Sequence, residues 1–195
     1  AEHEVLVKIV AVSINAADYR SLKMGLIPKK KIFGADISGI VEKVGQSVVN
    51  FKPNDEVFAD LSDYGFGGLA EYVAVPEKAV VLKPKEISFI DAASLPIAAI
   101  TALQSIKNRG KFVAGHSVLI VGSGGGVGTF AVQLANYFGA DVTAVCSNRN
   151  VEQSAALGAT TVIDYTKEDF TKTPKRFDRI IAVNGSQSLF TYKRL

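Results

Sequence analysis

The sequence predicts an α/β protein of two domains, a mostly-β domain over residues 1–87 and a doubly wound parallel sheet over residues 88–195. Short β-type segments separated by glycine and proline fill the first half. The pattern turns helical near Lys85, and strand-like and helix-like segments alternate from His116 onward, which is typical of parallel sheets with right-handed crossovers. The chain opens directly on a strand and stops inside an expected helix. We therefore expect segments to be missing at both termini.

The composition is that of an ordinary globular protein. Hydrophobic residues make up 48% and charged residues 21% of the 195, and the net charge is +3. So small a bias does not indicate nucleic acid or a membrane surface as a partner, and no apolar run approaches the length of a membrane span. The single cysteine, Cys146, excludes an intramolecular disulfide and favours a cytosol-like compartment. With only His3 and His116 beside it, a four-cysteine zinc site is excluded.

The first domain is interpreted as short strands around one short helix. Asp18 is expected to cap that helix, which runs to Met24. Near the domain boundary, Ser88 and Asp91 fit a capping box, and Pro96 separates this helix from a second one over residues 97–108. Strands are expected within residues 4–12, 33–45, 51–59, 70–76 and 80–84.

The second domain begins with an uninterrupted apolar run, residues 118–121, as expected for a parallel strand covered on both faces. Apolar residues then recur at helical spacing, and Gly139 suits the end of that helix. Further strands are expected at residues 142–146, 160–163 and 177–183, with a helix over residues 150–157. The sequence thus predicts at least four parallel strands.

A glycine cluster separates the first of these strands from its helix. The strict pattern G-x-G-x-x-G is absent because Val127 takes the last position, but G-x-x-G-x-x-G is present through Gly122, Gly125 and Gly128. Such a turn permits a sharp bend, lets the backbone approach a pyrophosphate and allows close packing of helix on strand. Gly124 lengthens the glycine run. We interpret this turn as a dinucleotide site, and the alternative is a structural turn that binds nothing.

The residues after the second parallel strand favour NADP(H). NAD enzymes usually place an acidic residue there to bind the ribose hydroxyls. This chain has Ser147 and Arg149 and no carboxylate. Ser147 can donate a hydrogen bond to a 2′-phosphate, and Arg149 can form a charge-assisted pair with it. The alternative is that Arg149 is simply a surface residue.

Five segments together resemble the medium-chain dehydrogenase/reductase superfamily, in particular its zinc-independent quinone oxidoreductase-like branch, which also holds alkenal and enoyl reductases. They are residues 13–18 (S-x-N-x-x-D), 33–39 (P-G-x-D-x-x-G, with Phe33 for proline), 95–102 (L-P-x-x-x-x-T-A), 122–128 and 157–165 (L-G-A-x-x-V-I-D-Y). The resemblance implies a GroES-like domain, a Rossmann domain and an active site in the cleft between them. It also implies that zinc is absent, because residues 15–18 lack the metal-binding cysteine of zinc-dependent relatives and Ala35 replaces their histidine.

The resemblance also implies site roles. Asn15 and Thr101 would approach the nicotinamide end of the cofactor. Backbone groups of the turn would bind the pyrophosphate: Gly122, Gly125, Gly126, Val127 and Gly128. The 2′-phosphate would be surrounded by Ser147, Arg149 and Tyr165, and the nicotinamide ribose by Asn184 and Gly185. The alternative for Asn15 and Asp18 is that they are plain turn and capping residues.

These patterns predict hydride transfer from NADPH to a quinone or an α,β-unsaturated carbonyl without zinc. Tyr19 and Tyr64 are candidate hydrogen-bond donors or substrate-lining groups, and Asn15 and Tyr19 are the candidate catalytic residues. The rival hypothesis is a non-catalytic or structural protein that binds NADPH, or an inactive fragment of such a reductase. We expect a cytoplasmic protein with a small-molecule substrate and no nucleic-acid or membrane partner, and leave a homodimer open.

Overall fold

The computed structural model describes residues 1–107, 110–185 and 187–195. They form two compact units, Ala1–Ile97 and Ala98–Leu195. The domain boundary that the sequence places after residue 87 stays a prediction. The expected end of the second helix at Asn108 lies outside the described residues.

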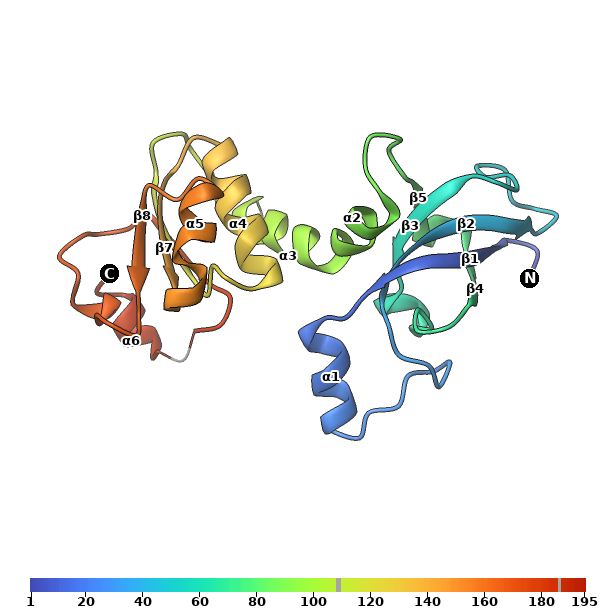
Figure 1. The fold of residues 1–195 in the computed structure, drawn as a ribbon, viewed down its shortest axis with the longest axis horizontal. Coiled ribbons are helices and arrows are strands. Elements are labelled where there is room, and N and C mark those ends of the chain that lie inside the picture. Colours follow the sequence, from blue (N-terminus) through green and yellow to red (C-terminus); the bar gives the residue numbers. More distant parts are fainter. Residues whose placement is uncertain (108–109, 186) are drawn as a thin grey trace. The chain divides into compact units, whose positions relative to one another are not determined.

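The first unit is built on an antiparallel sheet of five strands in the order β4-β1-β2-β3-β5 (Figure 1). The strands are β1 (Glu4–Ser13), β2 (Asp36–Val44), β3 (Glu56–Asp60), β4 (Tyr72–Pro76) and β5 (Val80–Leu82). Side chains alternate between the two faces of a strand, and alternate residues of β1 and β2, such as Val5, Val7 and Ile37, are fully buried in one core. The predicted small antiparallel domain is confirmed.

The first helix, α1 (Ala16–Lys23), corrects one expectation about capping. Its N-cap is Asn15, and Asp18 lies in the first turn. A carboxylate at the third helical position can reach back to the N-cap backbone, and Asp18 accepts the N–H of Asn15 at 2.8 Å. Asp18 is 4% exposed and also accepts the N–H of Gly34 at 3.2 Å. It therefore joins the start of α1 to the loop that precedes β2.

Two helices follow the sheet, α2 (Phe89–Ser94) and α3 (Pro96–Lys107). The predicted cap is confirmed, because the Ser88 hydroxyl accepts the N–H of Asp91 at 3.1 Å. Pro96 is the first residue of α3, where a missing N–H costs no helical hydrogen bond. Helix α2 packs on β1 and β2, and Ser38 of β2 donates to the carbonyl of Phe89 at 2.6 Å. Helix α2 is thus part of the first unit.

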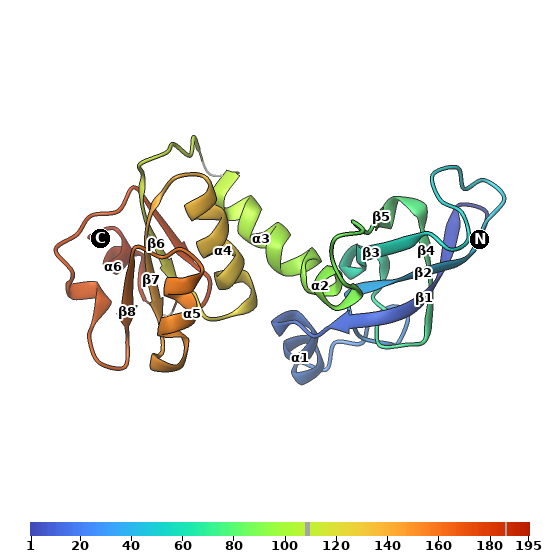
Figure 2. The same cartoon turned by 45° about the horizontal axis from the view of Figure 1, so that its top comes forward.

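The second unit contains a parallel sheet in the order β8-β7-β6-β9. The strands are β6 (Ser117–Val121), β7 (Asp141–Cys146), β8 (Thr161–Asp164) and β9 (Arg179–Ala182), and the helices are α4 (Gly126–Tyr137), α5 (Val151–Ala156) and α6 (Leu189–Tyr192). Helices α4 and α5 lie on one face of the sheet and α6 on the other (Figure 2). Val118 and Ile120 pack with α3 and α4, whereas Leu119 and Val121 pack with Phe170 and its neighbours. The strand covered on both faces is confirmed.

Candidate functional site

The glycine turn joins β6 to α4 and is held tightly against β7. Gly122 has φ +90°, a conformation that L side chains rarely adopt. The N–H groups of Gly122 and Ser123 donate to the carbonyl of Val145 at 2.9 and 3.1 Å. A Cβ on Gly128 would collide with the carbonyl oxygen of Gly122. Glycine at these positions therefore permits both the sharp bend and the close start of α4.

The middle of the same turn is open. A Cβ on Gly125 would come no nearer than 3.9 Å to another atom, and one on Gly126 would lie 3.6 Å from Ala98. Gly125 is the N-cap of α4, so the first N–H groups of this helix have no partner within it. Free backbone donors, clearance and the positive end of a twelve-residue helix fit a pyrophosphate.

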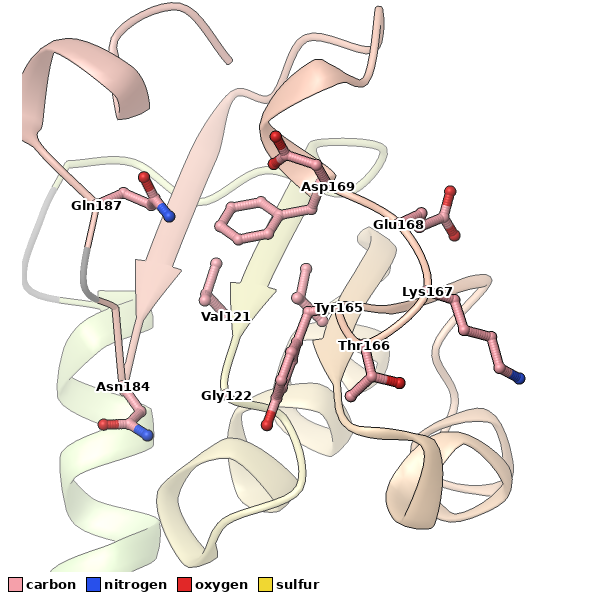
Figure 3. Close-up of a pocket in the computed structure, with 11 residues that line it drawn as sticks. Val121, Gly122, Tyr165, Thr166, Lys167, Glu168, Asp169, Asn184 and Gln187 are labelled. Carbon is pink, nitrogen blue, oxygen red and sulfur yellow. The ribbon is translucent and has the colours of Figure 1, made fainter.

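A pocket of about 520 Å³ lies beside the turn, at the carboxyl ends of the strands. Its walls come from β6, β7 and the segments after β8 and β9: Val121, Gly122, Val145, Tyr165, Thr166, Lys167, Glu168, Asp169, Phe170, Asn184 and Gln187. Figure 3 shows Tyr165 between Asn184 on one side and Thr166 on the other. Strand order reverses between β6 and β9, the place where open α/β sheets bind ligands.

Three of the predicted cofactor residues, Gly122, Tyr165 and Asn184, line this pocket. Ser147 and Arg149 do not line it. They lie in the turn after β7, where Ser147 is half-buried and Arg149 is exposed. The pocket-lining residue Lys167 donates to the side-chain oxygen of Asn148 at 3.4 Å and so connects the pocket wall to that turn.

Sequence reasoning missed the wall formed by residues 166–170 and Gln187. A signal for it exists at the end of β8, where the carboxylate of Asp164 accepts the N–H of Thr166 at 3.0 Å and its hydroxyl at 2.7 Å. This is an aspartate turn, in which a side chain replaces a backbone acceptor. The Thr166 hydroxyl holds the pKa of Asp164 below its ordinary value. The sequence Asp-Tyr-Thr at the end of a strand predicts such a sharp exit.

The extra glycine of the run, Gly124, also has a structural reason. The side-chain amide of Asn150 occupies the space that a Cβ of Gly124 would fill. Asn150 ends the turn after β7, and its N–H donates to the carbonyl of Ser147 at 2.9 Å. The glycine turn and the turn after β7 therefore pack directly against each other.

In the first unit, the half-buried Asn15 and the buried Asp36 form a pair that we call the Asn15–Asp36 cluster. Asp36 is fully buried and accepts the side-chain amide of Asn15 at 2.9 Å. It also accepts the N–H of Ile97, near the start of α3, at 3.1 and 3.3 Å. Burial raises the pKa of Asp36 to about 7, against the hydrogen bonds from Asn15 and Ile97, and the carboxylates of Asp60 and Asp18 add to the rise.

The remaining predicted residues lie apart from these features. Tyr19 on α1 is 46% exposed, and Tyr64 is half-buried in a short 3₁₀ turn. Thr101 is exposed on α3, and Gly185 is exposed directly after Asn184. The described residues contain no group of three or more His, Cys, Asp or Glu placed to hold a metal ion. No helix among them is long and apolar enough to cross a membrane.

Comparison with known proteins matches both units. Residues 1–85 match the alcohol dehydrogenase GroES-like domain, and residues 126–192 match the family described as zinc-binding dehydrogenase. The 2-methylene-furan-3-one reductase of Solanum lycopersicum is 43% identical over 91% of this chain and 48% of its own length. The chloroplastic NADPH-dependent alkenal/one oxidoreductase of Arabidopsis thaliana is 40% identical over 94% and 50%. The chain thus spans about half the length of these curated relatives.

Solved structures are similar to this chain over most of its length. The quinone oxidoreductase of Coxiella burnetii is 34% identical and superposes with a TM-score of 0.84, covering 94% of this chain and 61% of that one. The Escherichia coli quinone oxidoreductase complexed with NADPH is 27% identical, with a TM-score of 0.78 over 87% and 52%. The first unit is GroES-like and the second is Rossmann-like. The chain belongs to the medium-chain dehydrogenase/reductase superfamily and is similar to its quinone oxidoreductases.

Proposed function

We propose that this chain is part of an NADPH-dependent oxidoreductase that transfers hydride to a quinone or an α,β-unsaturated carbonyl. The observation that carries the proposal is the glycine turn, whose open backbone at Gly125 and Gly126 lies where the strand order reverses. Relatives named as a quinone oxidoreductase and an alkenal/one oxidoreductase support the two substrate classes.

The residues of the second unit would bind the cofactor in three parts. Backbone N–H groups at the start of α4 hold the pyrophosphate. Ser147 donates to the 2′-phosphate and Arg149 pairs with its charge, because residues 147–150 contain no carboxylate to repel it. Tyr165 and Asn184 contribute pocket walls, toward the 2′-phosphate and the nicotinamide ribose respectively. The bound nicotinamide supplies the hydride, and the protein orients the reactants and excludes water.

The residues assigned to the reacting end are also proposals. Asn15 and Thr101 approach the nicotinamide, Tyr19 and Tyr64 line the substrate site, and Asn15 and Tyr19 are the catalytic candidates. We propose that no zinc takes part. The amide of Asn15, in the segment where zinc-dependent relatives place a cysteine, is bonded to Asp36, and apolar Ala35 replaces their histidine.

A cytoplasmic location stays a prediction. Relatives of this chain are named as chloroplastic or mitochondrial proteins. Cell fractionation of the tagged full-length protein tests it, and recovery in an organelle fraction would contradict it.

The cofactor part of the proposal is tested by calorimetric titration of the chain with NADP⁺ and NAD⁺. We expect NADP⁺ to bind about tenfold more tightly, because a charge-assisted hydrogen bond contributes roughly 1.5–3 kcal/mol. Ser147→Asp should abolish this preference, since a carboxylate repels the 2′-phosphate. Ser188→Asp is the matched control, because it adds the same charge at the N-cap of α6, where aspartate is favoured. Equal affinities of the wild-type chain for NADP⁺ and NAD⁺ would contradict the NADPH assignment.

The reaction is tested by following NADPH oxidation with quinones, alkenals and enoyl thioesters. Turnover with one class identifies the hydride acceptor. Tight binding of NADP⁺ without turnover of any class would support the rival hypothesis of a protein that binds NADPH but does not oxidise it.

A further inference from the structure

The side chain of Asn150 has an unusual place for a capping residue. Asn150 is the N-cap of α5, a position where asparagine normally accepts a hydrogen bond from the first helical turn. Here the side chain makes no capping bond. It lies on Gly124, so closely that a Cβ at position 124 would overlap its amide. Its usual capping role therefore does not explain its orientation.

The amide nitrogen of Asn150 is available to a ligand. Within the described part of the chain, its Nδ2 makes no hydrogen bond, and it is not among the polar atoms that are buried without a partner. An amide nitrogen carries two donors and no acceptor. Two free donors on a half-buried side chain next to the glycine turn are suited to an anionic oxygen.

The surroundings of this amide favour a phosphate. Gly124 lies two residues before Gly126, where α4 and its N–H groups without a helical partner begin. On the other side, Arg149 precedes Asn150, and Lys167 reaches the same turn through Asn148. The acidic residue of this segment, Glu152, is exposed in the first turn of α5. The amide therefore lies between the residues proposed for the pyrophosphate and those proposed for the 2′-phosphate.

We propose that Gly124 and Asn150 form one binding element, in which Asn150 Nδ2 donates to a phosphate oxygen of the cofactor and the absence of a side chain at Gly124 lets the amide reach it. The inference rests on the proposed function, because the phosphate belongs to NADP(H). The shared chemistry is a phosphate oxygen on the adenosine side, from either the 2′-phosphate or the pyrophosphate.

The two residues are tested by a double-mutant cycle of Gly124→Ala and Asn150→Ala, with NADP⁺ affinity measured by calorimetry. The NADP⁺ affinity of each single variant should be about fivefold lower than that of the wild type, the loss expected for one hydrogen bond. The double variant should lose no more than Asn150→Ala alone, because the methyl group introduced by Gly124→Ala acts only by displacing the amide. Asn136→Ala is the matched control: the Asn136 amide lies on Gly158 in the same way, away from the turn, and its removal should leave the affinity unchanged.

Two further titrations identify the phosphate. If the amide binds the 2′-phosphate, Asn150→Ala should weaken the binding of 2′-AMP but not of ADP. If the amide binds the pyrophosphate, the variant should weaken the binding of ADP but not of 2′-AMP. Asn150→Asp is a second variant of the same shape and is also a favoured N-cap. It should weaken the binding of NADP⁺ more than Asn150→Ala does, because the charge of the aspartate repels phosphate.

The outcomes separate this inference from the proposed function. If the wild-type chain binds NADP⁺ and both Asn150 variants bind it equally well, the inference is overturned while the proposed function stands. If Gly124→Ala still weakens binding in the Asn150→Ala background, the coupling of the two residues is overturned. If the wild-type chain binds neither NADP⁺ nor 2′-AMP nor ADP, the proposed function and this inference fail together.

Discussion

Two asparagines occupy the same kind of position in the two units, the N-cap of a helix, and use their side chains differently. Asn15 donates its amide to the buried carboxylate of Asp36 at 2.9 Å and its backbone N–H to Asp18 at 2.8 Å. Asn150 makes no capping bond, and its amide lies on Gly124. In the first unit the polar groups of a motif are bonded to one another, whereas in the second unit the side-chain amide of Asn150 makes no hydrogen bond within the described residues, and the first N–H groups of α4 have no partner within that helix. Whether a residue can bind a ligand depends on the donors and acceptors that remain without a partner, more than on the residue type.

This difference bears on the alternatives that the sequence left open. The hydrogen bonds of Asn15 and Asp18 support their reading as turn and capping residues, because the Asn15 amide is bonded to Asp36 of β2 and the Asp18 carboxylate accepts the N–H groups of Asn15 and Gly34. A contact of Asn15 with nicotinamide stays a proposal. The start of α4 differs, because its first N–H groups, from Gly126 onward, have no partner within the helix, and a phosphate suits such donors.

The largest expected effect comes from making the same substitution at both caps. Asn15→Asp removes the donor to Asp36 and brings a second carboxylate against it, so the free energy of unfolding should fall by on the order of 3 kcal/mol. Asn150→Asp should change it by less than about 0.5 kcal/mol, since the half-buried side chain of Asn150 makes no capping bond that could be lost. Urea unfolding followed by circular dichroism measures both. Equal losses at the two sites would contradict the comparison.

A smaller effect is expected from the charge of Asp36. Its pKa rises to about 7 from an ordinary 3.8. Between these values the folded state holds a proton that the unfolded state has released, so stability should fall as pH rises through this window. The fall should be on the order of 2 kcal/mol between about pH 5 and pH 7.

Asp36→Asn should remove this pH dependence of stability, because the substituted amide does not titrate. Hydrogen exchange of the β2 amides reports the first unit by itself. Asp63→Asn is the control: the exposed carboxylate of Asp63 is not among the charges that act on Asp36, so the slope should stay. A wild-type protein as stable at pH 7 as at pH 5 would show that Asp36 is not protonated in the folded state.

The sequence predicted those parts of the fold that depend on neighbouring residues. The apolar run of β6, the stripe of α4 and the cap at Ser88 are local patterns, and the structure contains each of them. The partners of Asp36 lie 21 and 61 residues away, so no local pattern identifies them. The prediction of Asp18 as the cap was wrong. In the pattern N-x-x-D either residue can serve as an N-cap, and the sequence alone does not say at which of them the helix begins. The orientation of Asn150 depends on its packing against Gly124, which only the three-dimensional structure reveals.

The smallest change in stability, and the one that best separates stability from binding, is expected at Gly126. Alanine fits there, since the nearest atom to its Cβ would be that of Ala98 at 3.6 Å, and alanine favours a helix by up to about 1 kcal/mol over glycine. Gly126→Ala should therefore leave the protein as stable or slightly more stable. It should nevertheless weaken the binding of NADP⁺ severalfold, because the new methyl group occupies space into which the phosphate would fit. Gly128→Ala is the contrast: its Cβ collides with the carbonyl of Gly122, so stability and binding should fall together. If Gly126→Ala bound NADP⁺ as the wild type does, the open backbone of the turn would not be the site of the pyrophosphate.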